Sequence, residues 1–436
     1  MMLKPTPDGG NFMPLKLLAI GDMHLGRTPS RLPEELAGSG RSHGPTEAWN
    51  RAVRYAIETD VDVVALAGDL VDQEDDFFEA YRVLREGIKK LTRNEIEVLG
   101  IAGNHDVLVL PRLAQELPDF HLLGAGGHWE TRQFDEHLTL HGWSFPTRII
   151  KESPLAGHSF ERGPGVNLGL LHCDRDQRDS AYAPVSSGEL RAAGLDGWLL
   201  GHIHRPDTLT AENPSGYLGS ISGLHPGEHG VRGPWRIEIE HGRIASLEQC
   251  ALAPLHWQRI DLDLTDIESP EDADGRLLRR VRELEDELQA RPQPPLALGL
   301  RIRLIGRTHH GGAVADRLVE QTNVAGTHRL DSFIEKVTVA TRLETDLEQL
   351  AKRRHGKYPG QLARRLLLLQ RPADDNERRT LLESARRRLE SRVDEGRWTG
   401  LNRPELDDDS IAEMLADTGI RLLEDLLDQE QTEVRQ

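Results

Sequence analysis

Five short polar signatures in the first half of the chain most constrain what it can fold into. They are Gly21-Asp22-Met23-His24, Gly68-Asp69-Leu70-Val71-Asp72, Gly103-Asn104-His105-Asp106, Leu171-His172 and Gly201-His202-Ile203-His204. Each follows a short apolar run that predicts a β-strand. Strands that alternate with helices indicate a layered α/β fold, in which ligands bind beyond the carboxyl ends of the strands. One such signature is often only a turn, but five in this arrangement indicate a single functional site.

The signatures supply carboxylate, amide and imidazole groups, which are donors for divalent metal ions. Asp22 and His24 alternate along a strand end and can approach one ion together, as can His202 and His204. The two oxygens of Asp69 can bridge two ions, and ions about 3.5–4 Å apart would activate a shared water for in-line attack on phosphorus. The set favours Mn²⁺, although Fe and Zn are also compatible with it. The predicted ligands are Asp22, His24, Asp69, Asn104, His172, His202 and His204.

Three other signature residues have different predicted roles. His105 directly follows the ligand Asn104. It can donate a proton to the leaving alkoxide or stabilise charge on the phosphoryl oxygens, so it is the predicted catalytic residue. Asp72 and Asp106 are predicted to orient a ligating or catalytic imidazole. For Asp72, a helix N-cap or a solvated turn is an equally good explanation.

The length of 436 residues exceeds what one hydrophobic core usually holds and predicts several domains. We expect a flexible tail over 1–14, an α/β domain with the signatures over 15–250, a small α+β domain over 251–342 and a helical region over 343–436. Predicted strands of the α/β domain are Lys16–Ile20, Asp62–Ala67, Ile96–Ile101, His137–Trp143, Val166–Leu171 and Gly197–Leu200.

Two patterns distinguish the regions after residue 250. Residues 251–342 alternate in hydrophobicity in three places with helical spacing between them, which predicts the order β-α-β-α-β. From residue 343 the chain is highly charged and has four short apolar stripes. These stripes fit either a helical mini-bundle or helices that bury their apolar face on a partner.

Composition limits the class of protein. A charged fraction of 29% and the lack of a long apolar run predict a soluble protein without a membrane span. Only two cysteines occur, Cys173 and Cys250, so a disulfide framework is excluded and a reducing cytoplasm is expected. The net charge of −18 disfavours broad nucleic-acid binding by the chain alone, because phosphate contacts rely on clustered lysine and arginine.

The five signatures, in this order, resemble those of the calcineurin-like metallophosphoesterases. Within that superfamily, Asp22-Met23-His24-Leu25-Gly26 looks like the opening of the SbcD-type DNA repair exonucleases. The stretch Tyr217-Leu218-Gly219-Ser220, followed by Gly227-Glu228, is similar to the segment after their last histidine signature. More narrowly, His225-Pro226-Gly227-Glu228 through Leu255-His256-Trp257 looks like the YhaO branch of bacterial exonucleases.

This resemblance implies a four-layered α/β/β/α sandwich with a small α+β capping domain and a C-terminal helical region. It implies a Mn²⁺-dependent nuclease for DNA ends, a homodimer, and a helical region that docks an SMC-like ATPase. Asp22, His24, Asp69 and His204 would bind one ion, Asp69, Asn104, His172 and His202 the other, and His105 would be catalytic.

Two alternatives remain at this point. The first is a phosphodiesterase of small nucleotides, which shares all five signatures but usually lacks the added cap and tail. The second is a non-catalytic scaffold at DNA ends, against which the intact ligand residues argue. A protein phosphatase is disfavoured because Gln73-Glu74 follows Asp72 and Asp106 ends the third signature.

Overall fold

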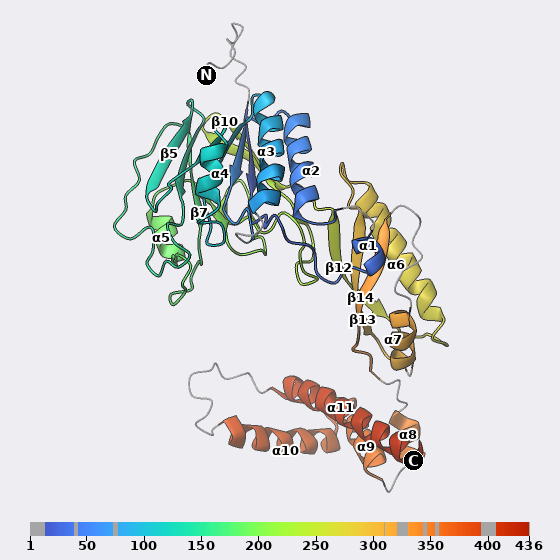
Figure 1. Ribbon diagram of the computed structural model, residues 1–436. Helices are drawn as coiled ribbons and strands as arrows, with labels where there is room; N and C mark the ends of the chain where they lie inside the picture. Colours follow the sequence, from blue (N-terminus) through green and yellow to red (C-terminus); the bar gives the residue numbers. More distant parts are fainter. Residues whose placement is uncertain are drawn as a thin grey trace. The chain divides into compact units, whose positions relative to one another are not determined.

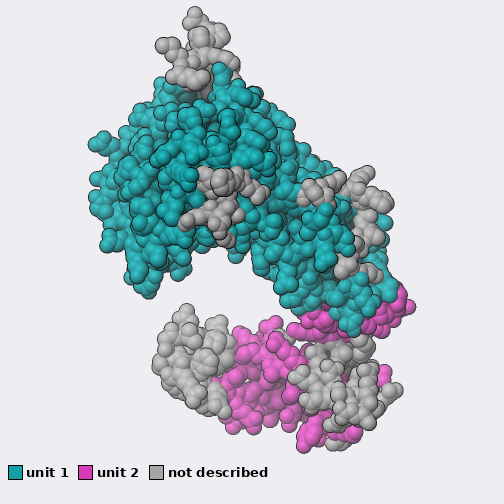
Figure 2. All heavy atoms as spheres, viewed as in Figure 1, with its two compact units in different colours: residues 1–262, 273–303, 315–338 teal, residues 263–272, 304–314, 339–436 magenta. Residues whose placement is uncertain are grey.

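The computed structural model describes residues 14–38, 42–72, 77–308, 310–320, 330–342, 347–353, 357–393 and 407–435. Apart from Pro14, the predicted tail lies outside the described residues. The chain divides into two compact units, of residues 1–262, 273–303 and 315–338 and of residues 263–272, 304–314 and 339–436 (Figure 2). This division passes through the region 251–342, so the domain boundaries at 250 and 342 stay predictions.

The first sheet has the strand order β11-β10-β1-β2-β3-β4, with β1 to β4 parallel. Within β1, Leu18 and Ile20 pack into the core beside the helices, whereas Leu17 and Ala19 pack into the core beside the second sheet. Burial on both faces explains why β1 is an almost continuous apolar run. The strands are β1 Leu15–Ile20, β2 Val63–Leu66, β3 Glu97–Gly100, β4 Phe120–Leu122, β10 Trp235–Glu240 and β11 Arg243–Gln249.

The second sheet has the order β5-β6-β7-β8-β9, and β6 to β9 are parallel. Its strands are β5 Trp129–Phe134, β6 Leu138–Trp143, β7 Val166–His172, β8 Gly197–Gly201 and β9 Ser215–Tyr217. Leu168 and Leu170 of β7 face the first sheet, while Trp198 of β8 belongs to a separate core on the outer face. Five strands were not predicted from the sequence: β5 and β9 in this sheet, and β4, β10 and β11 in the first sheet.

Helices complete the sandwich on both sides. On the first sheet lie α2 Pro45–Glu58, α3 Phe77–Arg93 and α4 Leu110–Glu116, and on the outer side of the second sheet lies α5 Ser187–Ala192 (Figure 1). Trp49 of α2 is fully buried and its indole Nε1 donates to the carbonyl oxygen of Val83 in α3. The predicted four-layered α/β/β/α sandwich is therefore confirmed.

The region after the sandwich has the predicted order β-α-β-α-β. Its elements are β12 Leu255–Asp263, α6 Asp272–Gln289, β13 Ala297–Ile305, α7 Gly311–Glu320 and β14 Asp331–Val339, with the sheet order β12-β13-β14. Leu32 and Leu36, in the segment after the first signature, pack against Leu255 and Trp257 of β12. Leu36 lies in the short helix α1 Glu34–Ala37. The sheet β12-β13-β14, called the cap sheet below, is thus in contact with the segment that follows the first signature.

The C-terminal helices are α8 Leu347–Arg353, α9 Tyr358–Leu369, α10 Asn376–Val393 and α11 Asp408–Arg435. The last two predicted apolar stripes, around Ile411 and Leu423, belong to the single helix α11, which continues through Gly419 because no proline separates them. Both of these side chains are buried, as are Leu366 of α9 and Leu382 of α10. In the described part of the chain, no helix has the length and apolar character needed to cross a bilayer.

Candidate metal centre

The five signatures lie at the carboxyl ends of five strands. Asp22 follows β1, Asp69 follows β2 and Asn104 follows β3, whereas His172 ends β7 and His202 follows β8. The first three strands are parallel neighbours in one sheet and the last two are parallel neighbours in the other. Because the two sheets pack face to face, these strand ends meet at one edge of the sandwich.

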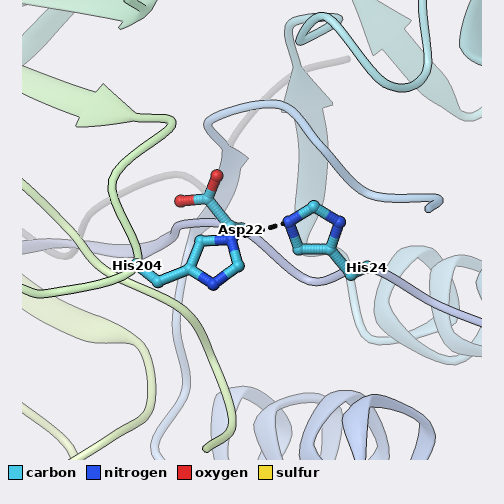
Figure 3. Close-up of side chains that lie close together, drawn as sticks. All are labelled: Asp22, His24 and His204. Carbon is cyan, nitrogen blue, oxygen red and sulfur yellow. Dashed lines mark hydrogen bonds between the residues drawn. The ribbon is translucent and has the colours of Figure 1, made fainter. Parts of the chain in front are cut away.

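Asp22, His24 and His204 form the first cluster, with one potential ligand atom from each within 4.8 Å of the others. The Nε2 atoms of His24 and His204 are 2.9 Å apart, and Figure 3 shows the two rings turned toward each other beside the Asp22 carboxylate. Asp22 and His24 are buried. Residues 180 positions apart in the sequence are therefore brought into one donor set.

Asp69, His172 and His202 form the second cluster by the same criterion of proximity. His172 Nε2 lies 3.3 Å from Asp69 Oδ2 and 3.1 Å from Asn104 Oδ1. The same Asp69 oxygen lies 4.0 Å from His24 Nε2 of the first cluster. The structure thus brings all seven predicted ligands together, with the Asp69 carboxylate between the two clusters.

The backbone at this edge is unusual. His24, Asp69 and His202 have φ values of 50°, 49° and 100°, in the left-handed region that L-residues with a side chain rarely adopt. A Cβ at Gly103 would lie 2.2 Å from Asp69 Oδ1, so only glycine lets this loop approach the carboxylate. Strained conformations of this kind collect at functional sites, where the surrounding structure enforces them.

The donor set fits a bound cation. Asp22 Oδ1 accepts a hydrogen bond from the backbone N–H of His202 at 2.9 Å, but Asp22 Oδ2 is buried and has no hydrogen-bond partner among the described residues. The Nδ1 atoms of His24 and His204 each lie within hydrogen-bond distance of a carboxylate, at 3.0 Å and 2.8 Å. If both Nδ1 atoms donate, the two facing Nε2 atoms carry lone pairs that repel each other unless a cation lies between them.

The electrostatics of the second cluster agree with this interpretation. Burial disfavours the imidazolium of His172, but the charge of Asp69 and the contact with it outweigh burial and raise the pKa of His172 to about 9. Burial of Asp69 acts against its ionisation, yet His172, His24 and His105 together lower the pKa of this carboxyl. Because a metal ion replaces protons on its ligands, a site that attracts a proton this strongly also attracts a cation.

Asp72 and Asp106 have different surroundings. Asp72 Oδ1 lies 3.0 Å from Nδ1 of His24, the kind of contact that was predicted for it. The Asp106 carboxylate instead accepts hydrogen bonds from the backbone N–H groups of Leu70 and Gly103, both at 2.7 Å, because it is buried beneath these two loops. Burial and the nearby charge of Asp69 raise the pKa of Asp106 to about 7. The described contacts therefore correct the prediction that Asp106 orients an imidazole: it holds the signature loops together.

His105 lies beside the first cluster. Its ring centroid is 5.2 Å from that of His24, nearly at a right angle, and its side chain is 44% exposed. Its backbone N–H donates to Asp69 Oδ1 at 3.0 Å, and its Nδ1 lies 3.0 Å from the carbonyl oxygen of Asp72. An imidazole that is fixed on one side and open to solvent on the other can meet a substrate.

Two carboxylates that sequence analysis did not assign to the site also contact its imidazoles. Glu228 Oε1 lies 2.8 Å from His204 Nδ1, and Asp174 Oδ1 lies 3.3 Å from His202 Nε2. A signal for Asp174 was available, because it lies two positions after His172, the spacing that also separates Asp22 from His24. Nothing in the local sequence indicated a contact for Glu228, which lies 24 residues after its partner.

Comparison with protein families gives two successive matches, separated by residues 207–256. Residues 15–206 match the calcineurin-like phosphoesterases, and residues 257–342 match the middle domain of the metallophosphoesterase YhaO. The first match contains all the signature residues. The second covers the region from β12 to just beyond β14.

Two curated relatives are similar over more than half of the chain. An uncharacterised metallophosphoesterase YhaO of Bacillus subtilis is 28% identical over 267 residues, 58% of this chain and 64% of the relative. A protein of Methanopyrus kandleri named DNA double-strand break repair protein Mre11 is 23% identical over 297 residues, 62% of each chain. The chain therefore spans less than two thirds of the length of each relative.

Solved structures show a more distant likeness. A dimetal phosphatase from Danio rerio is 13% identical, with 53% of this chain and 96% of that one covered and a TM-score of 0.36. The calcineurin-like phosphoesterase YfkN of Bacillus subtilis is 12% identical, with 54% and 89% covered and a TM-score of 0.34. The chain therefore contains a calcineurin-like metallophosphoesterase domain followed by a YhaO-type middle domain, and these matches support a YhaO-like metallophosphoesterase.

Proposed function

We propose that this chain is a two-metal phosphodiesterase that processes DNA ends together with an SMC-like ATPase. Metal-dependent hydrolysis of phosphoesters is the activity of its family. The observation that carries the two-metal part is the Asp69 carboxylate, whose Oδ2 lies 3.3 Å from His172 Nε2 and 4.0 Å from His24 Nε2. One carboxylate between two histidine clusters is the arrangement that a shared bridging ligand needs.

Each residue of the centre has a proposed role. Asp22, His24, Asp69 and His204 would hold one ion, and Asp69, Asn104, His172 and His202 the other, with Mn²⁺ as the proposed metal. When bound, the two ions supply an activated water near neutral pH and offset the charge of the phosphoryl group. His105 would donate a proton to the leaving oxygen of the substrate. Asp72 restrains the His24 ring by its contact with Nδ1.

Support for DNA as the substrate comes from the matches. The relative named DNA double-strand break repair protein Mre11 aligns over 297 residues, and the YhaO middle domain covers residues 257–342. The net charge of −18 does not favour a chain that holds DNA alone. We therefore include a homodimer and a basic ATPase partner, docked on the C-terminal helices, as part of the proposal.

A phosphodiesterase of small nucleotides is the second candidate. The net charge of −18 favours it, because a small substrate needs no long basic surface. A scaffold without activity is disfavoured, because all seven predicted ligands lie within the two clusters and their immediate contacts. A protein that catalyses no reaction has no need for this arrangement of metal ligands.

The proposal is tested by incubating the purified protein with Mn²⁺ and either end-labelled linear duplex DNA or bis(p-nitrophenyl) phosphate. Asp69→Ala should abolish hydrolysis of both substrates while the circular dichroism spectrum stays that of the wild type. His105→Ala should lower turnover by about 100-fold or more, the usual contribution of general acid catalysis, and change Mn²⁺ affinity much less. Asp119→Ala, at an exposed aspartate between α4 and β4, is the matched control.

The outcomes separate the candidates. Metal-dependent release of label that Asp69→Ala abolishes supports a nuclease. Hydrolysis of the small diester without cutting of DNA favours the small-nucleotide enzyme, unless addition of the ATPase restores cutting. Full activity of Asp69→Ala would show that the two-metal interpretation is wrong.

A further inference from the structure

We propose that Glu228 and Asp174 are positioning residues of the metal centre, and that each controls a different ion. Glu228 holds the imidazole of His204 in the first cluster, and Asp174 holds the imidazole of His202 in the second. This inference rests on the proposed two-metal function. It adds two carboxylates from outside the five signatures and assigns each of them to one ion.

The contact between Glu228 and His204 is direct, and the Glu228 side chain is largely buried. Glu228 Oε1 lies 2.8 Å from His204 Nδ1, and the Glu228 side chain is only 16% exposed. On the opposite side of the ring, His204 Nε2 faces His24 Nε2 at 2.9 Å, next to Asp22 (Figure 3). The imidazole of His204 therefore lies between the Glu228 carboxylate and the other two residues of the first cluster, Asp22 and His24.

Glu228 is itself held by other groups. Its second oxygen, Oε2, accepts hydrogen bonds from the backbone N–H of Leu224 at 2.9 Å and from the Ser220 hydroxyl at 3.2 Å. The buried Arg232 donates from Nη1 to the carbonyl oxygen of His204. With Oε2 engaged by fixed donors, Oε1 is held in position to accept from the imidazole. A surface ion pair between mobile side chains would not have these additional restraints.

Asp174 has the same role at the second cluster. Its Oδ1 lies 3.3 Å from His202 Nε2, and its Oδ2 accepts a hydrogen bond from the Ser180 hydroxyl. Its backbone N–H donates to the carbonyl oxygen of Tyr182 at 2.9 Å. Asp174 follows His172 by two residues, so a single segment supplies one ligand of the second cluster and the carboxylate that orients another.

The chemical consequence is the choice of tautomer. A carboxylate that accepts from one ring nitrogen keeps the proton there and leaves the lone pair of the other nitrogen for a cation. With Glu228 on Nδ1 of His204, the lone pair is on Nε2. The 3.3 Å contact of Asp174 Oδ1 with His202 Nε2 favours the proton on Nε2 and the lone pair on Nδ1. His24 and His172 are held in the same way, by Asp72 and by the carbonyl oxygen of Ala67 at 3.1 Å.

The test uses the full chain and Mn²⁺ alone, without DNA. Calorimetric titration gives the affinity and number of sites, and electron paramagnetic resonance distinguishes a coupled Mn²⁺ pair from a single ion. Glu228→Gln and Asp174→Asn should each weaken one of two sites by about 10–100-fold and leave the other nearly unchanged. Asp22→Ala and Asn104→Ala identify the two sites, so Glu228→Gln should reproduce the loss seen with Asp22→Ala. Glu285→Gln is the matched control, because Glu285 is a buried carboxylate that accepts from Ser332 in the cap.

Each result has a defined meaning. Unchanged Mn²⁺ affinity in both variants overturns the inference, as does equal weakening of both sites by each of them. If Glu228→Gln does not fold, Glu228→Asp keeps the charge but withdraws it from His204 and should weaken the same site. A wild-type chain that binds fewer than two Mn²⁺ ions refutes the proposed two-metal function instead, so the two failures are distinguishable.

Discussion

Individual residues at the candidate centre are held in conformations that their own chemistry disfavours. His24, Asp69 and His202 have positive φ, and one oxygen of Asp22 is buried without a partner among the described residues. Each unusual backbone conformation costs on the order of 1–3 kcal/mol. The cores packed beneath the signature loops offset this cost, because β1, β2, β7 and β8 are buried along almost their whole length. The stability of the sandwich thus maintains the geometry of the site.

A buried histidine of the cap should make stability depend on pH. Burial, reinforced by the charge of Arg291, lowers the pKa of His256 to about 4, against 6.5 in an unfolded chain. Between these values the unfolded state binds the proton and the folded state does not, so stability falls as pH decreases from 6.5 toward 4. From pH 7 to pH 5 this amounts to about 2 kcal/mol.

His256→Gln should remove that contribution. Urea unfolding in EDTA at pH 7 and pH 5 is the measurement, and the variant should lose about 2 kcal/mol less stability than the wild type between these pH values. His121→Gln, at a largely exposed histidine of β4, serves as the control. Identical losses in wild type and His256→Gln would contradict the prediction.

At the scale of elements, the β10–β11 hairpin shows what the pattern of hydrophobicity misses. β10 pairs antiparallel with β1 and forms part of the sheet that carries the first three signatures. Its turn is His241-Gly242, with φ of 50° and 73°, as tight hairpins require. β11 has no fully buried position and its sequence lacks a clear apolar alternation, so the pattern gave no signal for it. β10 was also not predicted, although Trp235, Ile237 and Ile239 alternate with polar residues and are buried.

Two glycines of the cap should respond oppositely to the same substitution. A Cβ on Gly299 in β13 would lie 2.1 Å from the Trp257 ring, whereas a Cβ on Gly275 in α6 meets nothing within 4 Å. Gly299→Ala should therefore destabilise the protein by about 1–3 kcal/mol through overpacking. Gly275→Ala should stabilise it by about 0.5–1 kcal/mol, because alanine is the better helix former.

Chemical denaturation of the two variants and the wild type checks this pair. The Trp257 fluorescence should also change in Gly299→Ala, since the ring must move, and stay constant in Gly275→Ala. Equal stability of the two variants would mean that the cap is not packed as described.

For the whole molecule, the candidate centre and the C-terminal helices are separate parts of the sequence. None of the described contacts of the centre involves a residue after Arg232. Deletion of residues 343–436 should therefore leave hydrolysis of bis(p-nitrophenyl) phosphate unchanged, because every proposed ligand is retained. If α8 to α11 form the proposed docking region, the deletion should also abolish co-purification with the proposed SMC-like ATPase.

Co-purification from cells that express both proteins, with full-length and truncated chains side by side, checks the second part. Deletion of residues 1–12, which precede the first strand, is the matched control. If the chain without residues 343–436 still binds the ATPase, the docking proposal is wrong.

Sequence alone determined the layered sandwich, the β-α-β-α-β order of the cap, the six residues of the two donor clusters and their neighbour Asn104. This was possible because each signature directly follows a buried parallel strand, so a local pattern indicates a shared edge. The partners of Asp106, Asp174 and Glu228 were decided only by the tertiary structure. A hydrogen bond between Glu228 and His204 depends on how the loops after β8 and β9 fold against each other, and no periodicity in the chain records that distance.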